Sequence, residues 1–396
     1  MAVATIIGID KIGFYSPEYY LDLTDLATAR QVDPAKYKIG IGQDQMAVLP
    51  ADQDIVTMAA NAAAQILDQA DRQQIDLLIF ATESGIDQSK AAALYLQELL
   101  QINHQARAFE IKEACYGATA GLQIAYDHLA AHPTSQKVLV VGADVARYGI
   151  ATAGEVTQGA GAVALLITRQ PRLLGLQQPT AYYSEEIMDF WRPNYRDTAL
   201  VDGKFSTAQY LRFLDLTWQA YRAKTGTQLT DLTAVLFHIP FTKLGLKGLR
   251  QLTTDLAAAT KESYFDYFQQ ATVYNRQVGN LYTGSLYLSL LSLLDQQQLA
   301  AGSKIGLYSY GSGAVAEFFT AVVQPNYQQT LQVACHQQQL HQRQRLTVAE
   351  YEQFFMQTGL TDDHDFQIKR QSPHADFYFA GQTDQRRIYQ RKEPVK

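Results

Sequence analysis

Three side chains stand where this sequence could carry out nucleophilic and acid–base chemistry. Glu83 closes the apolar run DLLIFATE, His238 closes VLFH, and Cys115 precedes a helical pattern in ACYGATAGL. A carboxylate in an apolar pocket has a raised pKa, which suits a general base or acid near neutral pH. A helix N-terminus stabilises a thiolate, so we expect the pKa of Cys115 to be lowered. A histidine at the C-terminal end of a strand faces the ligand crevice of an α/β sheet.

Each of these residues also has a plain structural interpretation, which the sequence leaves open. A free cysteine is usually a small buried hydrophobic group, a histidine can be hydrogen-bonded in the core, and a glutamate can lie in an ordinary loop. Beyond His238, Lys243 and Lys247 are four residues apart and share a face if the segment is helical. Two ammonium groups at a pocket mouth suit a phosphate-rich ligand, and a solvated basic face is the alternative.

The motifs of metal and nucleoside triphosphate chemistry are absent from the sequence. It contains no HExxH, no CxxC and no GxxxxGKS/T pattern. The Gly-rich segments GAGAV and GSGAV begin at Gly159 and Gly311. They lack the further spacing of a dinucleotide-binding fingerprint, and we expect them to be turns. We therefore expect no metal ion and no nucleoside triphosphate chemistry.

The elements that must position these residues alternate between strands and helices. Short apolar runs typical of strands begin at Ala4, Ile75, Lys137, Gly161, Thr233 and Lys304. Helical spacing of apolar residues covers 55–67, the residues after Cys115, and 284–299. This alternation predicts an α/β fold rather than separate α and β domains.

The same order of features occurs twice along the chain. A strand ends in a polar residue, a buried helix follows, and a further strand leads into a Gly-rich segment. Glu83 and Cys115 fall in the first copy, and His238 and Asn280 fall in the second. We expect two pseudo-duplicated halves, residues 1–170 and 226–396, with an inserted segment at 171–225.

Composition limits the partners and the location. The chain has 396 residues, a formal net charge of −6 and 47% hydrophobic residues, which excludes extended disorder and gives no electrostatic footprint for nucleic acid or an anionic membrane. No apolar run approaches the roughly 20 residues of a membrane span, and we expect no signal peptide. Two cysteines cannot form a disulfide framework, so we expect a reducing cytoplasm. The basic residues after Gly381 are expected to form a solvated tail.

Ten longer motifs follow one another along residues 30 to 320. They are KYKIGIGQ (36–43), ATESGIDQSK (81–90), EACYGAT (113–119), GADVARYG (142–149), TQGAGAVALL (157–166), DFWRP (189–193), VDGKFS (201–206), FHIPFTKLGLK (237–247), GNLYTGSLY (279–287) and YSYGSGAVAEFF (308–319). In this order they resemble the bacterial type of the 3-hydroxy-3-methylglutaryl-CoA (HMG-CoA) synthase family, in the thiolase superfamily.

The resemblance implies a thiolase-like layered αβαβα fold in a homodimer. It implies condensation of acetyl-CoA with acetoacetyl-CoA and water to HMG-CoA, in the mevalonate route to isoprenoids, with CoA thioesters as substrates and no cofactor. Cys115 would attack the acetyl thioester, and Glu83 would remove a methyl proton. Backbone N–H groups would stabilise the thioester oxygen. His238 would polarise the ketone and protonate the new alkoxide, before water releases the product.

The resemblance also implies a set of binding residues. Asn280 and Ser312 match positions that contact the acyl group or the oxyanion, and the CoA phosphates would be bound by Lys36, Lys243 and Lys247. Further pocket positions are Asp33, Tyr148, Thr157, Asp189 and Ser206. The segment GIATAGEV, directly after Tyr148, lacks the Asn expected there.

Three other classes of protein stay open on sequence. A ketoacyl-ACP synthase or polyketide synthase uses Cys, His and Asn, generally without the strand-end carboxylate that Glu83 provides. A cysteine hydrolase would use Cys115 and His238 and transfer the acyl group directly to water. A non-catalytic scaffold would keep the fold for binding alone, against which the intact set of polar residues argues.

Overall fold

A ten-stranded sheet runs through the molecule in the order β12-β13-β14-β8-β1-β7-β6-β4-β5, with β9 beside β14. The computed structural model describes residues 6–357 and 363–393. The strands of this sheet are β1 (Ile7–Tyr15), β4 (Ile75–Ala81), β5 (Arg107–Ile111), β6 (Lys137–Ala146), β7 (Gly159–Arg169), β8 (Leu174–Leu176), β9 (Ala181–Ser184), β12 (Ala234–Phe237), β13 (Lys304–Gly311) and β14 (Val315–Val323). Short β8 pairs with β1 and with β14, and so joins two wings of the sheet. The first wing comprises β1, β7, β6, β4 and β5, and the second comprises β14, β13, β12 and β9.

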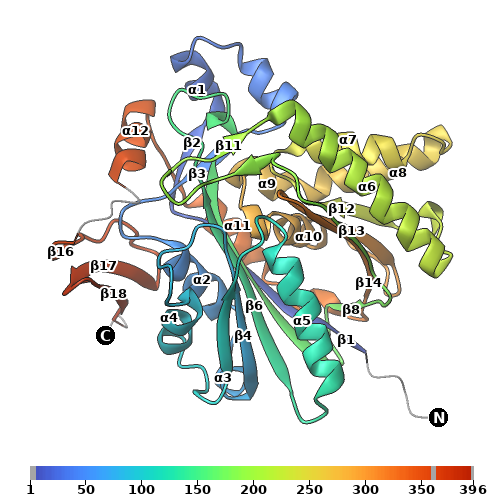
Figure 1. The fold of residues 1–396 in the computed structure, drawn as a ribbon, viewed down its shortest axis with the longest axis horizontal. Coiled ribbons are helices and arrows are strands. Elements are labelled where there is room, and N and C mark those ends of the chain that lie inside the picture. The colour runs from blue at the N-terminus through green and yellow to red at the C-terminus, as the bar shows by residue number, and fades with distance from the viewer. Residues whose placement is uncertain (1–5, 358–362, 394–396) are drawn as a thin grey trace.

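Helices form three layers around the two wings (Figure 1). The central layer holds α5 (Gly117–Ala131) and α10 (Ser285–Gln296), whose side chains share one apolar core with both wings. The outer face of the first wing is covered by α2 (Ile55–Ala64) and α4 (Ala92–Leu99), and that of the second by α6 (Gly203–Thr225), α7 (Thr242–Leu252) and α8 (Ala258–Ala271). The expected α/β class and αβαβα layering are confirmed.

The alternation of strand residues explains why each wing is covered on both faces. Along β6, Val138 and Val140 belong to the central core, whereas Leu139 and Val141 belong to the core under α2. Successive side chains of a strand point to opposite faces, so a strand buried on both sides is a continuous apolar run. The continuous apolar run KVLVVGA therefore predicts a strand that is buried between two helical layers.

The remaining elements lie around this body. They are β2 (Tyr19–Asp22), β3 (Gln45–Val48), β10 (Phe190–Trp191), β11 (Leu200–Val201), β15 (Gln344–Arg345), β16 (Phe366–Gln367), β17 (Phe377–Thr383), β18 (Arg386–Arg391), α1 (Leu23–Ala29), α3 (Gln69–Gln74), α9 (Val273–Val278), α11 (Val333–His341), α12 (Val348–Gln357) and the single turns η1 (Lys36–Ile41), η2 (Glu155–Thr157), η3 (Leu229–Asp231), η4 (Tyr282–Gly284) and η5 (Tyr327–Thr330). Among the helices in the described ranges, none combines the length and apolar character that a membrane crossing requires.

Two sequence predictions about strands need correction. The run from Lys304 forms two antiparallel strands, β13 and β14, joined by the turn that contains GSGAV. The matching segment GAGAV is not a turn, because Gly159 begins β7. Its glycine serves a close contact, since a Cβ at Gly159 would lie 2.6 Å from the backbone nitrogen of Asn280. Residues 4 and 5 of the first expected strand lie outside the described residues. The division into two halves with an insertion at 171–225 stays a prediction.

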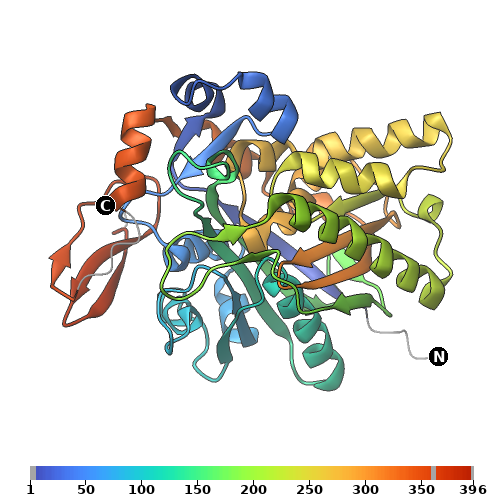
Figure 2. The same cartoon turned by 45° about the horizontal axis from the view of Figure 1, so that its top comes forward.

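The basic segment after Gly381 is an ordered hairpin rather than a solvated tail. Figure 2 shows β16, β17 and β18 as a red extension at the left of the molecule. Arg387 and the hydroxyl of Tyr389 both donate to Asp54 Oδ2, at 2.8 and 2.7 Å. Asp54 is the N-cap of α2, so the hairpin fixes the start of that helix. The prediction of a solvated tail is wrong for Arg387, which is bound to Asp54, whereas Arg386 and Arg391 are exposed as predicted. Lys396 lies outside the described range.

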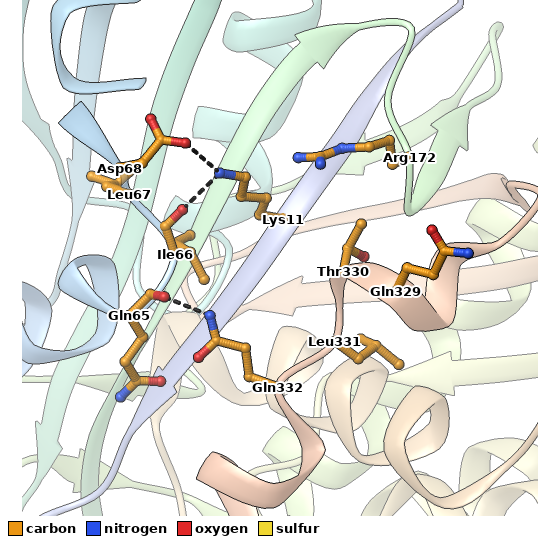
Figure 3. A pocket seen from close by; sticks show the side chains of 10 residues that line it. All are labelled: Lys11, Gln65, Ile66, Leu67, Asp68, Arg172, Gln329, Thr330, Leu331 and Gln332. Carbon is orange, nitrogen blue, oxygen red and sulfur yellow. Dashed lines mark hydrogen bonds and ion pairs between the residues drawn. The ribbon is translucent and has the colours of Figure 1, made fainter. Parts of the chain in front are cut away.

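A cavity of about 360 Å³ opens between the end of α2, β1 and η5 (Figure 3). Its two cationic side chains are already paired, Lys11 with Asp71 and Arg172 with Asp10, each at 2.6 Å. Asp71, which binds Lys11 of the cavity, also binds Lys137 at the start of β6, where the β6–β7 ladder begins with the pair Lys137 and Thr168. The predicted catalytic residues lie toward the opposite end of that ladder, so this cavity is separate from them.

Candidate active site

Cys115 and Glu83 are in direct contact although they come from different elements. Glu83 follows β4, and Cys115 lies two residues before the start of α5. The thiol Sγ of Cys115 donates to Oε1 of Glu83 at 3.2 Å. Directly before the thiol, Ala114 has a φ of 39°, a left-handed conformation that non-glycine residues rarely adopt. The chain is thus bent sharply at the point where it presents the sulfur to the carboxylate.

The electrostatics of this pair confirm one prediction and overturn another. Burial, followed by the nearby Asp144 carboxylate, raises the pKa of Glu83 to about 8, as expected for a strand-end carboxylate. Burial and the Glu83 carboxylate raise the pKa of the Cys115 thiol well above its ordinary value. The expected lowering by the helix N-terminus is wrong, because lost hydration and an adjacent negative charge outweigh the helix dipole.

Asp144 holds the turn that carries Glu83, and sequence reasoning missed it. This fully buried carboxylate follows the apolar run of β6. Its Oδ1 accepts hydrogen bonds from the backbone N–H of Glu83 at 2.8 Å and from the hydroxyls of Thr82 and Ser84, each at 2.9 Å. Its Oδ2 accepts from the Thr283 hydroxyl at 2.5 Å. A polar residue directly after an apolar run is the signal that pointed to Glu83. The same signal marks Asp144, which follows the run KVLVVGA.

Asn280 and Tyr148 form a second group beside the thiol. Asn280 is 1% exposed, and its Oδ1 accepts from the backbone N–H of Tyr282 at 2.9 Å and from the hydroxyl of Ser285 at 3.0 Å. Its Nδ2 donates to the Tyr148 hydroxyl at 3.3 Å. Burial raises the pKa of Tyr148, as do the charges of Cys115 and other nearby groups.

The segment after Tyr148 supports that ring instead of providing the expected Asn. Gly154 packs beneath Tyr148, since a Cβ there would lie 2.7 Å from the Tyr148 Cβ. Glu155 accepts from the backbone N–H of Ala151 at 3.0 Å and pairs with Arg30 at 2.7 Å. The Thr157 hydroxyl donates to the Gly154 carbonyl at 2.8 Å, within η2.

His238 follows β12 and is fixed by its backbone. Its N–H donates to the Tyr308 carbonyl at 2.8 Å, and its carbonyl accepts from the Tyr210 hydroxyl at 2.9 Å. The residue is 3% exposed, and ring atom Nδ1 has no hydrogen-bond partner among the described residues. Burial lowers the pKa of His238 to about 3. The imidazole is therefore neutral at physiological pH.

One strand connects His238 to the helix that follows the thiol. β13 lies beside β12, and its Ser309 hydroxyl accepts from Thr119 on the first turn of α5 at 2.8 Å. Gly311, at the end of the same strand, packs on the segment around Cys115, where a Cβ would lie 2.7 Å from the backbone nitrogen of Tyr116. The end of β13 thus lies between His238 and Cys115.

Asp189 organises the turn that carries Ser312. Its fully buried carboxylate accepts from the Tyr310 hydroxyl at 2.8 Å, the Gly313 backbone N–H at 3.0 Å and the Ser206 hydroxyl at 3.0 Å. Asp189 and Ser206 therefore bond to each other, while Ser312 lies between two residues that Asp189 holds. Arg192, three residues further along, donates to the backbone carbonyl of Glu83. It lies in DFWRP, a motif from which sequence reasoning took only Asp189.

The lysines predicted to bind phosphate lie on two elements, η1 and α7, that are joined by a hydrogen bond at the start of α7. Lys243 and Lys247 lie one turn apart on this helix, as predicted, and no described residue pairs with either ammonium. Gln43 joins η1 to α7, because its Oε1 accepts from the Thr242 hydroxyl at 2.7 Å. Lys36 lies on η1 and is exposed. Asp33 accepts from the Ala35 backbone N–H at 2.9 Å, just before η1.

Within the described residues, no group of three or more His, Cys, Asp or Glu side chains could hold a metal ion. The available chemistry is that of a thiol, a carboxylate with a pKa near 8 and a neutral imidazole. Such a set suits covalent capture of an acyl group followed by proton abstraction.

Comparison with known proteins gives one consistent result. Residues 4–171 match the family model described as hydroxymethylglutaryl-coenzyme A synthase N terminal, and 176–264 together with 250–392 match the C-terminal model. The chain is 52% identical over 357 residues to the hydroxymethylglutaryl-CoA synthase of Enterococcus faecalis, covering 90% of this chain and 93% of that protein. It superposes on a crystal structure of HMG-CoA synthase complexed with CoA with a TM-score of 0.94 at 44% identity, covering 98% of this chain and 100% of that one. A structure of MvaS in complex with 3-hydroxy-3-methylglutaryl coenzyme A gives a TM-score of 0.90 at 35% identity, with 99% and 100% coverage.

Proposed function

The chain belongs to the hydroxymethylglutaryl-CoA synthase family, and from this premise we propose how its own residues carry out the reaction. The enzyme is an acyltransferase that condenses acetyl-CoA with acetoacetyl-CoA and water to (S)-HMG-CoA and free CoA. Our proposal assigns Cys115 as nucleophile, Glu83 as the base of the condensation and His238 as hydrogen-bond donor to the second substrate. The observation that carries it is the 3.2 Å contact between the Cys115 thiol and the Glu83 carboxylate.

The first step moves the acetyl group from CoA to Cys115. The sulfur attacks the thioester carbon, and Glu83 lies within hydrogen-bond reach to take the thiol proton as the new bond forms. The CoA sulfur leaves and takes that proton. Backbone N–H groups at the start of α5 stabilise the oxyanion in our proposal, because the first turn of a helix leaves such donors free.

The second step forms the carbon–carbon bond. Acetylation removes the thiol hydrogen from Glu83 and leaves its carboxylate facing the acetyl methyl group. Glu83 takes a methyl proton, and the resulting carbanion attacks the ketone carbon of acetoacetyl-CoA. A base with a pKa of about 8 is well matched to this task near neutral pH.

The role of His238 changes in the light of its burial. An imidazole with a pKa of about 3 carries no extra proton, so it acts as a neutral N–H donor that polarises the ketone oxygen. The alkoxide then receives the proton that Glu83 took from the methyl group. Water finally adds to the thioester carbon on Cys115, the thiol regains a hydrogen, and HMG-CoA leaves.

Substrate binding is assigned to the groups around this centre. Lys243 and Lys247 on α7, together with Lys36 on η1, bind the CoA phosphates in our proposal, since their ammonium groups have no partner among the described residues. Asn280 and Ser312 border the acyl group. The outer pocket positions are Asp33, Tyr148, Thr157, Asp189 and Ser206, of which Asp189 and Ser206 act by holding each other and the Ser312 turn.

The proposal extends to assembly and location. Strand β5 is one edge of the main sheet, and its Phe109 and Ile111 are only partly buried. We propose that a second copy of this chain pairs at that edge to form a homodimer, tested by light scattering on the parent and on Ile111→Lys. We also propose a cytoplasmic enzyme of the mevalonate route that needs no cofactor, supported by two free cysteines and by CoA thioester substrates.

The decisive experiment separates acyl transfer from condensation. Glu83→Ala should still accept acetyl from acetyl-CoA onto Cys115, more slowly, which intact-protein mass detects as one added acetyl group. Its rate of HMG-CoA formation should fall by about 10²–10⁴, the usual loss on removing a general base. Cys115→Ser should take no acetyl group, and acetylation at Cys335 would contradict the assignment. Near-parental condensation by Glu83→Ala would show that another residue is the base, and acetate as the sole product would indicate a hydrolase.

A further inference from the structure

Arg192 and Asp144 bind different main-chain atoms of Glu83. Its guanidinium donates to the backbone carbonyl of Glu83, while Asp144 accepts from the backbone N–H of the same residue at 2.8 Å. Both polar groups of the Glu83 main chain are therefore held by charged side chains. A base whose backbone is held in this way keeps one position through the reaction.

The charge of Arg192 is not neutralised elsewhere. No carboxylate among the described residues forms an ion pair with its guanidinium. The other charged and titratable groups that face Glu83 are Asp144 on β6, Glu113 before α5, the Cys115 thiol, and the phenol groups of Tyr148 and Tyr282. Both carboxylates raise the pKa of Glu83, whereas Arg192 lowers it. Arg192 is thus the cation that opposes burial at this carboxylate.

The segment that carries Arg192 spans the site. Asp189 binds Tyr310 and Gly313 at the end of β13, and Arg192 binds Glu83 at the end of β4. Only Phe190 and Trp191 thus separate an anchor in the second wing from an anchor in the first. Because Asp189 is buried and fully bonded, it fixes where the guanidinium can reach.

We propose that Arg192 is a positioning residue of the condensation step, which holds the Glu83 main chain and supplies the positive charge that favours its carboxylate form. This inference rests on the role of Glu83 proposed above. It deepens that role, because it states why a carboxylate among two others and a thiol is available as a base. The guanidinium does not touch substrate in this account and acts only through Glu83.

The test measures the second half-reaction alone. Enzyme acetylated at Cys115 is mixed with acetoacetyl-CoA in a rapid-quench instrument between pH 6 and 9.5, and HMG-CoA is quantified. In the parent, the rate should rise with pH through a midpoint set by the Glu83 carboxylate. In Arg192→Gln that midpoint should move up by about one pH unit, the size of shift that a nearby opposite charge produces. The rate at pH 7 should then fall about tenfold and recover in part at pH 9.5.

Two further variants separate charge from simple support. Arg192→Lys keeps the charge and one donor, so its midpoint should stay close to that of the parent. Arg196→Gln removes a positive charge from the same segment at an exposed side chain, and its midpoint should not move. Melting temperatures of all variants show whether each protein is folded.

The outcomes are distinct. An unchanged midpoint in Arg192→Gln, with only a lower rate at every pH, overturns the inference, as does Arg192→Lys behaving like Arg192→Gln. If Glu83→Ala still condenses the two substrates, the proposed function fails instead, whatever the Arg192 variants do. If Glu83→Ala is inactive while the Arg192→Gln midpoint is unmoved, the proposed function stands and this inference alone is wrong.

Discussion

Glu83→Gln should make the folded protein more stable at pH 8.5, at the expense of condensation. In the parent, the pKa of Glu83 rises from 4.5 to about 8 on folding, because burial disfavours the charged form. The unfolded chain therefore loses this proton near pH 4.5 and the folded chain only near pH 8. Between those values the folded state binds more protons, so stability falls as pH rises through the window.

The magnitude follows from the size of that window. At about 1.4 kcal/mol for each pH unit, the ionised side chain lowers the free energy of unfolding by at most about 5 kcal/mol above pH 8. Glu83 keeps partial exposure, so we expect about 2–4 kcal/mol after solvent screening. Gln is uncharged at every pH and still offers an oxygen to the Cys115 thiol. For a chain of 396 residues this corresponds to a rise in melting temperature of about 2–5 °C at pH 8.5.

The assay is differential scanning fluorimetry at one scan rate, on parent and Glu83→Gln, at pH 5, 7 and 8.5. The difference in melting temperature should be smallest at pH 5 and grow with pH. Glu262→Gln, at an exposed position on α8, serves as the matched control and should follow the parent at all three values. A constant difference between parent and Glu83→Gln across the three pH values would mean that Glu83 ionises as freely folded as unfolded, and the reasoning above would be refuted.

Three other predictions follow from the same geometry. Iodoacetamide should alkylate Cys115 about tenfold faster in Glu83→Gln than in the parent at pH 8, because loss of the adjacent carboxylate lowers the thiol pKa. Mass spectrometry of the alkylated peptides, with Cys335 as internal reference, measures the two rates, and equal rates would contradict the prediction. Lys243→Ala and Lys247→Ala should each weaken binding of acetyl-CoA by about 1–3 kcal/mol, whereas Arg250→Ala on the same helix should not; a double variant with parental affinity would make both lysines a solvated face. The His238 ring should stay neutral down to about pH 4, since burial lowers its pKa to about 3; imidazole NMR, with His238→Gln to assign the signal, would show titration near pH 6.5 if the ring were accessible to water.

The sequence predicted the position of a functional residue best where that residue directly follows the strand that places it. Glu83 and His238 both follow apolar runs, and both lie beyond the ends of the strands those runs form. The same signal marks Asp144, which received no role because nothing local distinguishes a carboxylate that reacts from one that holds a turn. Its four partners come from two segments, and only the fold brings them together.

Long-range electrostatics and close packing could not be predicted from local patterns. The helix after Cys115 favours a lowered pKa, yet burial and the carboxylate of Glu83, from 32 residues away in the chain, raise the thiol pKa instead. The sequence around Gly159 resembles a turn. Glycine is needed there because a side chain would collide with the backbone of Asn280, which is distant in sequence. The role of Arg192 likewise could not be predicted locally, because it depends on a hydrogen bond to the backbone carbonyl of Glu83.

The C-terminal hairpin affects how the chain folds during synthesis. Arg387 binds Asp54 across 333 residues of sequence, and the backbone N–H of Phe377 donates to Asn61 on α2 at 3.1 Å. Phe377 and Ala375 also complete the apolar core under α2, which otherwise consists almost entirely of residues from the first 170. At about 5–20 residues per second, a ribosome needs tens of seconds between releasing α2 and releasing its last partners. During that interval the core under α2 lacks Ala375 and Phe377, so the apolar surface that these two residues cover stays open to solvent.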